Sequence, residues 1–162
     1  MAGKRTNPGE SALRRGRRSL ANQGYFITFT SYRRTRWFRD WEAGWAMSSL
    51  LQTPGRWPGA QLLAWVLMPD HWHGILVIDE GVELGSLMKA AKGSSSREFN
   101  RILSRTGAVW GPGFHDRAIR QEEGLRAAAR YLVANPVRAG LVASVGDYPF
   151  WDAAWICDET PV

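Results

Sequence analysis

Hydrophobic and polar positions alternate in the first part of the chain that can build a core. In residues 24–32 (GYFITFTSY), aromatic and β-branched side chains follow a period of two, which is the period of a β-strand. A second apolar run, residues 61–68, has strand length, and the chain returns at once as HWHGILVID in residues 71–79. Pro69-Asp70 between them suits a tight turn, because proline presets φ at the first corner and aspartate is favoured at the second. We therefore predict a strand followed by a β-hairpin.

Three longer stretches follow the 3.6-residue period of an α-helix. Asp40 is the expected N-cap of the first, and the third is the strongest because acids open it and three consecutive alanines follow. GSSS at 93–96 is expected to break or kink the second helix, and Asn135-Pro136 to end or bend the third. The three stretches are residues 40–52, 84–103 and 121–134.

The order of these elements predicts the fold class. With FHDRAIR (114–120) as a further short strand, the chain reads βαββαβ with an appended helix. This is an α+β arrangement, a ferredoxin-like or RRM-like antiparallel sheet with helices packed on it. Residues 1–22 contain little to bury and are expected to be a basic flexible arm, while residues 23–162 form a single domain. An aromatic tail with Tyr148, Trp151 and Trp155 is expected to pack back on that domain.

Charge gives the first hint of function. The chain of 162 residues has a net charge of +6 and a pI of about 10.1, which favours a polyanionic partner. Residues 1–39 hold ten Lys or Arg residues against the single acid Glu10. The simple interpretation is a solvated tail that aids solubility. The RRGRR segment (14–18) instead favours an arm that contacts phosphates.

Cysteine content and the length of the apolar runs predict the cellular compartment. The single cysteine, Cys157, excludes an internal disulfide and suits a reducing compartment, and no motif around it suggests catalysis. No apolar run has the length of a membrane span, and no signal-type stretch follows the basic start. We expect a cytoplasmic protein without a membrane partner.

Two of the three histidines open the returning strand of the hairpin. In a strand, residues i and i+2 point to the same face, so His71 and His73 can both be directed at one ion while Trp72 points away. The alternative is two polar residues tolerated near a strand end. A metal needs a further ligand, and oxygen donors favour Mg²⁺ or Mn²⁺ over zinc.

The third predicted helix offers residues that complement this pair. Tyr131 and Asn135 are four residues apart and share one helix face, and the small residues Gly124, Ala127 and Ala128 continue that stripe and leave room for a ligand. A helical tyrosine usually serves packing. Its small neighbours make this position unusual for a core.

Four sequence blocks carry a resemblance to a known family. PDHWHGILV, FHDRAIR, YLVANPVRAGLV and DYPFW occur in this order and closely resemble the REP-associated tyrosine transposases, bacterial relatives of the single-tyrosine HUH transposases of insertion sequences. The resemblance covers roughly residues 14–151. It implies cleavage and rejoining of single-stranded DNA at hairpins called repetitive extragenic palindromes (REP), through a 5′-phosphotyrosine.

The resemblance also implies roles for individual residues. His71 and His73 would hold Mg²⁺ or Mn²⁺, Tyr131 would be the nucleophile, and Asn135 stands where relatives place a polar third ligand, often glutamine. His115 and Asp116 match a family block to which we assign no role. The expected DNA-binding residues are Arg14, Arg15, Arg17, Arg18, Arg33, Arg34, Arg36, Arg117 and Arg120.

Two other functions stay open at this point. One is a catalytically inactive protein that binds nucleic-acid hairpins, because asparagine at position 135 is one methylene shorter than glutamine. The other is an RNA-binding module that uses a basic, aromatic sheet, with an accidental pair of histidines. For the enzyme we expect a monomer, because the aromatic tail can cover a sheet edge that would otherwise pair with a second subunit. The alternative is that these aromatic residues form a dimer contact themselves.

Overall fold

Five antiparallel strands form one sheet in the order β4-β1-β3-β2-β5. The computed structural model describes residues 23–120 and 122–154, so the predicted arm (1–22) and the end of the tail, with Trp155 and Cys157, lie outside the described residues. The strands are β1 (Gln23–Thr30), β2 (Ala60–Met68), β3 (His71–Ile78), β4 (His115–Ile119) and β5 (Trp151–Ala153). The helices are α2 (Trp41–Gln52), α3 (Leu84–Ile102), α4 (Glu122–Val133) and the short α5 (Asn135–Arg138), with 3₁₀ turns η1 (Tyr32–Arg34), η2 (Trp37–Arg39) and η3 (Val145–Asp147).

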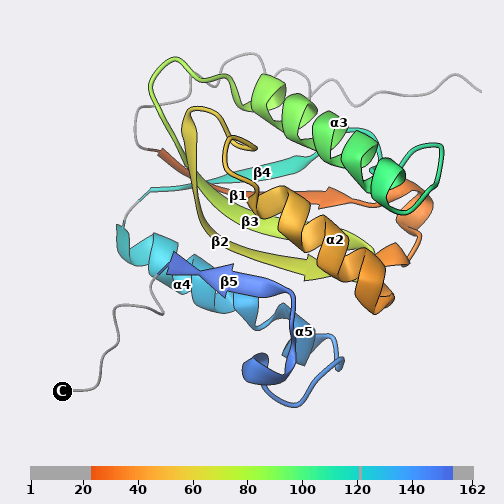
Figure 1. Ribbon diagram of the computed structural model, residues 1–162. Coiled ribbons are helices and arrows are strands. Elements are labelled where there is room, and N and C mark those ends of the chain that lie inside the picture. The colour runs from red at the N-terminus through yellow and green to blue at the C-terminus, as the bar shows by residue number, and fades with distance from the viewer. Residues whose placement is uncertain (1–22, 121, 155–162) are drawn as a thin grey trace, which may run out of the picture.

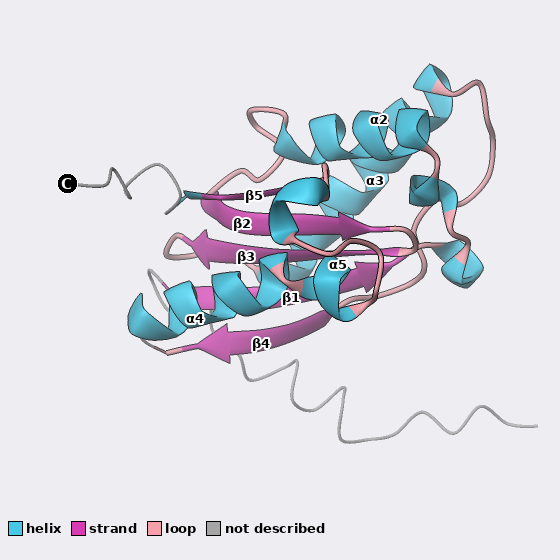
Figure 2. Cartoon of the chain, turned by 90° about the horizontal axis from the view of Figure 1, so that it is seen from below, coloured by secondary structure: helices cyan, strands magenta, loops and turns pink. Residues whose placement is uncertain are grey.

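The helices cover both faces of the sheet. Helices α2 and α3 lie on one face, and α4 crosses the other, followed by α5 (Figures 1 and 2). The predicted α+β sandwich with an antiparallel sheet is confirmed. The predicted N-cap is confirmed as well, since the Asp40 carboxylate accepts from the Ala43 N–H at 3.0 Å.

The hairpin turn fixes the register of the central strands. Met68 is paired with His71, so only Pro69 and Asp70 lie between the two strands, as predicted. Because side chains alternate between faces, this register puts Trp72 on one face and its two histidine neighbours on the other.

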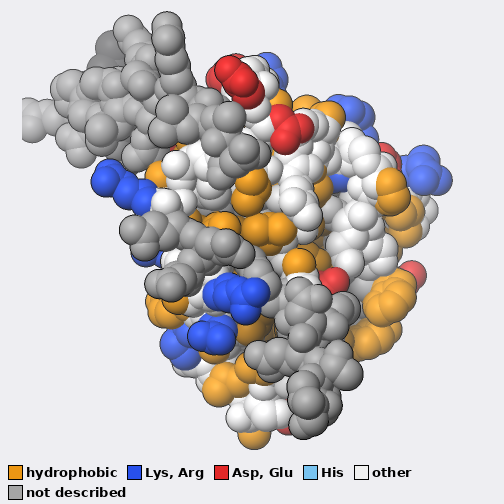
Figure 3. Space-filling model, turned by 90° about the vertical axis from the view of Figure 1, so that its left-hand side faces the viewer, with side chains coloured by type: hydrophobic (Ala, Val, Ile, Leu, Met, Phe, Trp, Pro, Cys, Tyr) orange, Lys and Arg blue, Asp and Glu red, His pale blue; other side chains and the backbone are white. Residues whose placement is uncertain are grey.

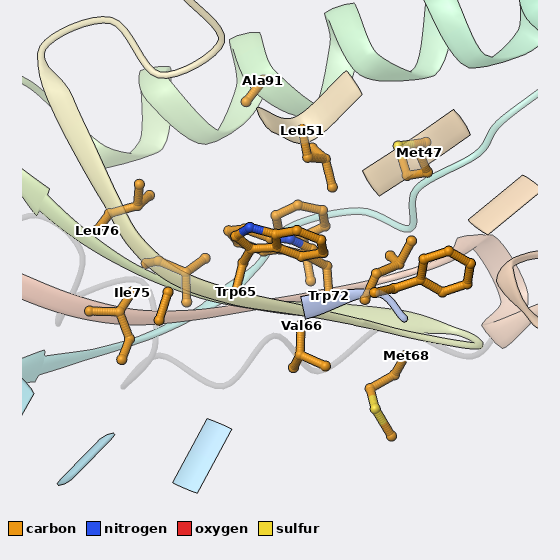
Figure 4. Close-up of a cluster of buried hydrophobic side chains, with 14 of the residues drawn as sticks. Met47, Leu51, Trp65, Val66, Met68, Trp72, Ile75, Leu76 and Ala91 are labelled. Carbon is orange, nitrogen blue, oxygen red and sulfur yellow. The ribbon is translucent and has the colours of Figure 1, made fainter. Parts of the chain in front are cut away.

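The core lies mainly between the sheet and the pair α2 and α3. Trp65 and Trp72 point to this side, whereas Val66 and Met68 point to the α4 side (Figure 4). Trp72 is fully buried, and its ring stacks on Trp57 with 5.3 Å between ring centroids. Among the described residues, the indole N–H of Trp72 has no hydrogen-bond partner, so Trp72 contributes there through packing.

The predicted break at GSSS is wrong, because α3 runs unbroken through residues 93–96. Ser94 and Ser95 return their hydroxyls to the helix, donating to the carbonyls of Ala90 (2.8 Å) and Lys92 (3.2 Å). The segment also serves packing: buried Ser95 accepts from the Trp110 indole at 3.1 Å. Small side chains at this point let neighbouring groups approach the helix.

The aromatic tail packs back on the domain, as predicted for the residues that the structure describes. Tyr148 and Phe150 are buried, and the Tyr148 hydroxyl donates to the Leu67 carbonyl. Strand β5 then pairs with β2 and extends the sheet beyond that strand. Within the described residues, no helix is both long and apolar enough to cross a membrane.

The helical stripe of tryptophans on α2 faces outward. Trp41 and Trp45 are 60% and 59% exposed and stack on each other with 6.0 Å between ring centroids. The buried face of α2 is instead made of smaller residues such as Met47 and Leu51.

Candidate active site

His71 and His73 lie on the α4 side of the sheet, next to each other. Their ring centroids are 4.6 Å apart, with the ring planes at 80°. Each imidazole is partly buried, while Trp72 between them is fully buried on the opposite face. The predicted separation of the histidine pair from the tryptophan is therefore confirmed.

Asp70 orients the first imidazole. His71 Nδ1 lies 2.7 Å from Asp70 Oδ1, and because a carboxylate only accepts, Nδ1–H is the donor; in the neutral ring, Nε2 then carries the lone pair. The other carboxylate oxygen lies 3.6 Å from Arg34 Nε. A hairpin-turn residue thus fixes both the ring and its tautomer.

Thr28 orients the second imidazole from the neighbouring strand. Its Oγ1 lies 2.7 Å from His73 Nδ1, and the Phe26 ring packs beside the imidazole at 5.5 Å between centroids. The pKa of His73 is lowered to about 3, first by burial and then by the charges of His71, Arg138 and Arg34. His73 is therefore neutral at physiological pH, which is the state that a metal requires.

The donor set suits a divalent ion. Both imidazoles use Nδ1 for a hydrogen bond inside the protein, which is the usual arrangement when Nε2 binds a metal. In the part of the chain that the structure describes, no three His, Cys, Asp or Glu side chains could hold a metal together. A third ligand from these described residues would therefore have to be of another chemical type, such as an amide.

Tyr131 is displayed near the end of α4 and is 58% exposed. Arg138 from α5 places its guanidinium 3.8 Å from the centroid of the Tyr131 ring. Because the same Arg138 lowers the pKa of His73, its charge acts on both parts of the candidate site. Tyr131 and Phe26 line the same groove, and the Phe26 ring packs against His73, so the tyrosine and the histidine pair lie on the same side of the sheet within one chain.

Asn135, the predicted third ligand, forms hydrogen bonds at the junction of α4 and α5. Its side-chain amide donates to the Leu132 carbonyl at 3.0 Å, and its Oδ1 accepts from Arg138 at 2.8 Å. One lone pair of Oδ1 stays available for a metal. Ligation by Asn135 stays a prediction, but its support of Arg138 is a role that the sequence did not suggest.

An open groove of about 820 Å³ lies beside Tyr131, between β4 and α4. The room predicted above the small residues of α4 is present, because Gly124, Ala127 and Ala128 line this groove. Arg117 and Arg120 also line it, which places two of the predicted DNA-binding residues next to the tyrosine.

His115 lies on β4 in the same row of the sheet as His73. It is paired with Thr28 of β1, which in turn is paired with His73, so His115 is two strand spacings, about 10 Å, from the histidine pair. His115 is exposed, and Asp116 alternates to the other face. Neither residue lies beside the pair, and the roles of both stay open.

The predicted DNA-binding arginines after β1 surround the hairpin turn. The Ser31 N–H donates to the Asp70 carbonyl at 2.9 Å, and the Phe38 N–H donates to the Pro69 carbonyl at 3.1 Å. Arg33 and Arg34 both have φ of +56°, a strained conformation for residues with a side chain. This segment is thus tied to the hairpin turn, and of its arginines Arg34 is placed beside the site, with Nε 3.6 Å from Asp70 Oδ2. The arm residues Arg14, Arg15, Arg17 and Arg18 lie outside the described residues.

A family model described as "Transposase IS200 like" matches residues 20–134, which include both histidines and Tyr131. The chain belongs to the IS200-like transposase family. This agrees with the resemblance carried by the four sequence blocks.

Individual relatives narrow the comparison. A curated REP-associated tyrosine transposase of Escherichia coli (strain K12) is 32% identical over 91 residues, which are 56% of this chain and 52% of that protein. The match thus spans about half the length of the curated relative. A solved structure of a REP-associated tyrosine transposase bound to a REP hairpin aligns with a TM-score of 0.62 and 25% identity, over 83% of this chain and 79% of that chain.

A second solved structure supports the fold. A crystal structure of a Deinococcus radiodurans R1 protein assigned as a transposase aligns with a TM-score of 0.54 and 22% identity. The alignment covers 74% of this chain and 95% of that chain. The resemblance to REP-associated tyrosine transposases is therefore confirmed by both sequence and structure.

Sequence reasoning missed four supporting residues. Asp70 was interpreted only as a turn residue, although an acid directly before a histidine pair is a usable signal for an orienting partner. Arg138 stood inside a recognised block but received no role. Thr28 and Phe26 reach the site by strand pairing, which no local pattern reveals.

Proposed function

We propose that this chain is a metal-dependent single-stranded DNA endonuclease and strand transferase. It would cut and rejoin DNA at REP-type hairpins through a 5′-phosphotyrosine on Tyr131. The observation that carries this proposal is that Tyr131 and the histidine pair lie on the same side of the sheet within one chain, connected through Phe26, which lines the groove with Tyr131 and packs against His73.

Different residues are proposed to attack the scissile phosphate, to orient the tyrosine ring and to bind the DNA. In the proposed reaction, the Tyr131 oxygen forms a bond to phosphorus while the bond to the 3′ oxygen breaks. This leaves a 5′-phosphotyrosine and a free 3′-hydroxyl, and the reverse reaction rejoins the strand. Arg138 keeps the tyrosine ring in place and adds positive charge where phosphate approaches.

His71 and His73 are the proposed metal ligands, with Asp70 and Thr28 fixing their rings. A bound Mg²⁺ or Mn²⁺ would polarise a non-bridging oxygen of the scissile phosphate. Asn135 remains the proposed third ligand from the protein. Mg²⁺ commonly completes its shell with substrate phosphate and water, so the small protein donor set is compatible with such an ion.

The proposed substrate is hairpin DNA with a single-stranded flank. A solved relative carries a REP hairpin, and this chain brings several arginines to the same side as its tyrosine. Arg33, Arg34 and Arg36 are proposed to contact the hairpin backbone, and Arg117 and Arg120 the strand beside Tyr131.

Covalent trapping tests the proposal. Purified protein is incubated with Mn²⁺ and single-stranded oligonucleotides that each carry a REP-type hairpin and a randomised 5′ tetranucleotide. We expect a denaturation-resistant protein–DNA adduct that disappears with EDTA or in Tyr131→Phe. The matched control is Tyr32→Phe, because Tyr32 is also exposed and also has an arginine over its ring, Arg33 at 5.1 Å.

The outcomes separate the competing functions. Tyr131→Phe should keep hairpin affinity because it removes only one oxygen. Hairpin binding without an adduct would identify an inactive hairpin-binding protein. A preference for RNA over the same DNA sequence would identify an RNA-binding module. An adduct that persists in Tyr131→Phe would show that another nucleophile acts.

A further inference from the structure

The groove beside Tyr131 has walls of two different kinds. Arg117 on strand β4 and Arg120 just after it form one wall, and helix α4 contributes small side chains such as Ala127. Figure 3 views the molecule from the side where β4 passes into α4, and Lys and Arg side chains lie there beside hydrophobic ones. Such a combination suits a ligand with a flat apolar part and a negative charge.

One wall of the groove is a stacked pair. The Arg117 guanidinium lies over the Phe26 ring with 5.4 Å to its centroid. Phe26 holds this plane in position because its ring also packs against His73, 5.5 Å between centroids. A planar guanidinium backed by an aromatic ring is a surface on which a nucleobase stacks well.

The groove narrows toward the start of α4. A Cβ added at Gly124 would lie 3.1 Å from Ile119 Cγ2, and one added at Gly24 would lie 2.4 Å from Leu125 Cδ2. Helix and sheet are therefore in close contact there, whereas exposed Tyr131 borders the groove elsewhere. The groove therefore ends at the start of α4 and is open beside Tyr131.

We propose that this groove binds one nucleobase of single-stranded DNA, that of the nucleotide adjoining the phosphate that Tyr131 attacks. The base stacks on the Arg117 guanidinium, and Arg120 binds its phosphate. This assignment rests on the proposed function, because the bound base is identified as the neighbour of the phosphate that Tyr131 attacks. Since every base has a flat face, the groove anchors the strand without selecting its sequence.

Fluorescence of 2-aminopurine tests the assignment. The full chain is bound, in EDTA to prevent cleavage, to hairpin oligonucleotides that carry 2-aminopurine at one flanking position each. We expect strong quenching at a single position, since stacking quenches this base. Removing the base at that position should weaken binding about 5- to 150-fold, the range for one stacked base.

Substitutions at two positions of the groove, Ala127 and Arg117, test the space for the base and separate stacking from charge. Ala127→Leu projects three further carbon atoms into the groove and should weaken the quenching, whereas Ala127→Ser keeps the room and should preserve it. Arg117→Lys keeps the charge but loses the planar stack, so quenching should disappear while the salt dependence of binding is unchanged. Arg126→Lys is the matched control, because exposed Arg126 lies on α4 and does not line the groove.

The result is independent of the trapping experiment. Quenching at no position, or quenching that Ala127→Leu does not weaken, overturns the groove assignment even if the adduct forms. If the adduct forms, its junction marks the attacked phosphate, and a quenched base elsewhere on the strand also overturns the assignment. Selective quenching without an adduct would support a base site in the groove and contradict only the proposed catalysis.

Discussion

Arg138 covers the ring of Tyr131 at 3.8 Å, although the two residues belong to different helices. The turn at Ala134 between α4 and α5 brings them together, and Asn135 Oδ1 holds the guanidinium at 2.8 Å. The side chain proposed to attack DNA is exposed, so this contact is what restricts its position.

Replacing Arg138 should slow adduct formation more than it weakens DNA binding. Arg138→Gln removes both stack and charge, and a lost cation–π contact predicts a rate about 2- to 30-fold lower. The rate of Arg138→Lys should lie between those of Arg138→Gln and the wild type, because lysine keeps the charge but not the planar group. Single-turnover rates at saturating hairpin DNA measure this. Equal rates in all three proteins would contradict the role.

Asp70→Asn should raise the Mn²⁺ concentration needed for half-maximal adduct formation. Asparagine keeps the shape but no longer fixes the proton on His71 Nδ1, and loss of such an orienting partner typically weakens metal binding about 10- to 100-fold. A Mn²⁺ titration, with binding followed by calorimetry, measures the effect. Asp152→Asn on β5 is the control, and an identical titration curve for both variants would exclude an orienting role for Asp70.

The sheet edge and the site geometry predict a tyrosine that acts in cis. Strand β5 pairs with the β2 edge, and Tyr131 lies on the same side of the sheet as the histidine pair of its own chain. Mixing Tyr131→Phe with a variant that carries both His71→Ala and His73→Ala should therefore give no adduct at any ratio. Recovered activity would reveal a composite site shared between two subunits.

Deleting residues 1–20 tests the basic arm. The deletion removes six basic side chains, Lys4, Arg5, Arg14, Arg15, Arg17 and Arg18. If the arm contacts phosphates, hairpin affinity falls and the slope of log K against log salt becomes shallower by about 0.7–0.9 for each lost contact. Fluorescence anisotropy at several salt concentrations gives the slope. An unchanged slope would assign the arm to solubility alone.

Gly74→Ala should destabilise the fold. The added Cβ would lie 1.9 Å from Trp72 Cη2, and this fully buried ring has no free space into which to move. Overpacking of this kind lowers the free energy of unfolding by about 1–3 kcal/mol. Urea unfolding measures the loss. Gly146→Ala, where an added Cβ meets nothing within 4 Å, should unfold at nearly the wild-type midpoint.

Local patterns in the sequence were sufficient for most of the fold. The alternation in residues 24–32 identified β1 and also its two faces, since Tyr25, Ile27 and Phe29 are all buried. Pro69-Asp70 identified the hairpin, and the alternation of side chains along the strand after this turn placed His71 and His73 on one face of the sheet. Such signals work because the period of a strand and the geometry of a tight turn depend only on neighbours along the chain.

The parts that sequence reasoning missed depend on tertiary contacts. GSSS discourages a helix locally, but Ser95 is fully buried against Trp110, and packing outweighs the weak propensity. Thr28 reaches His73 through the pairing of β1 with β3, which is set by the whole sheet.

The two-residue turn at Pro69-Asp70 also limits how this chain can change in evolution. A single inserted or deleted residue there would shift β3 by one position against β2 and exchange its faces. The imidazoles would then enter the core, and the indole of Trp72 would occupy the site. A length change in another loop has local effects, whereas a length change at this turn would disrupt both the hydrophobic core and the histidine site.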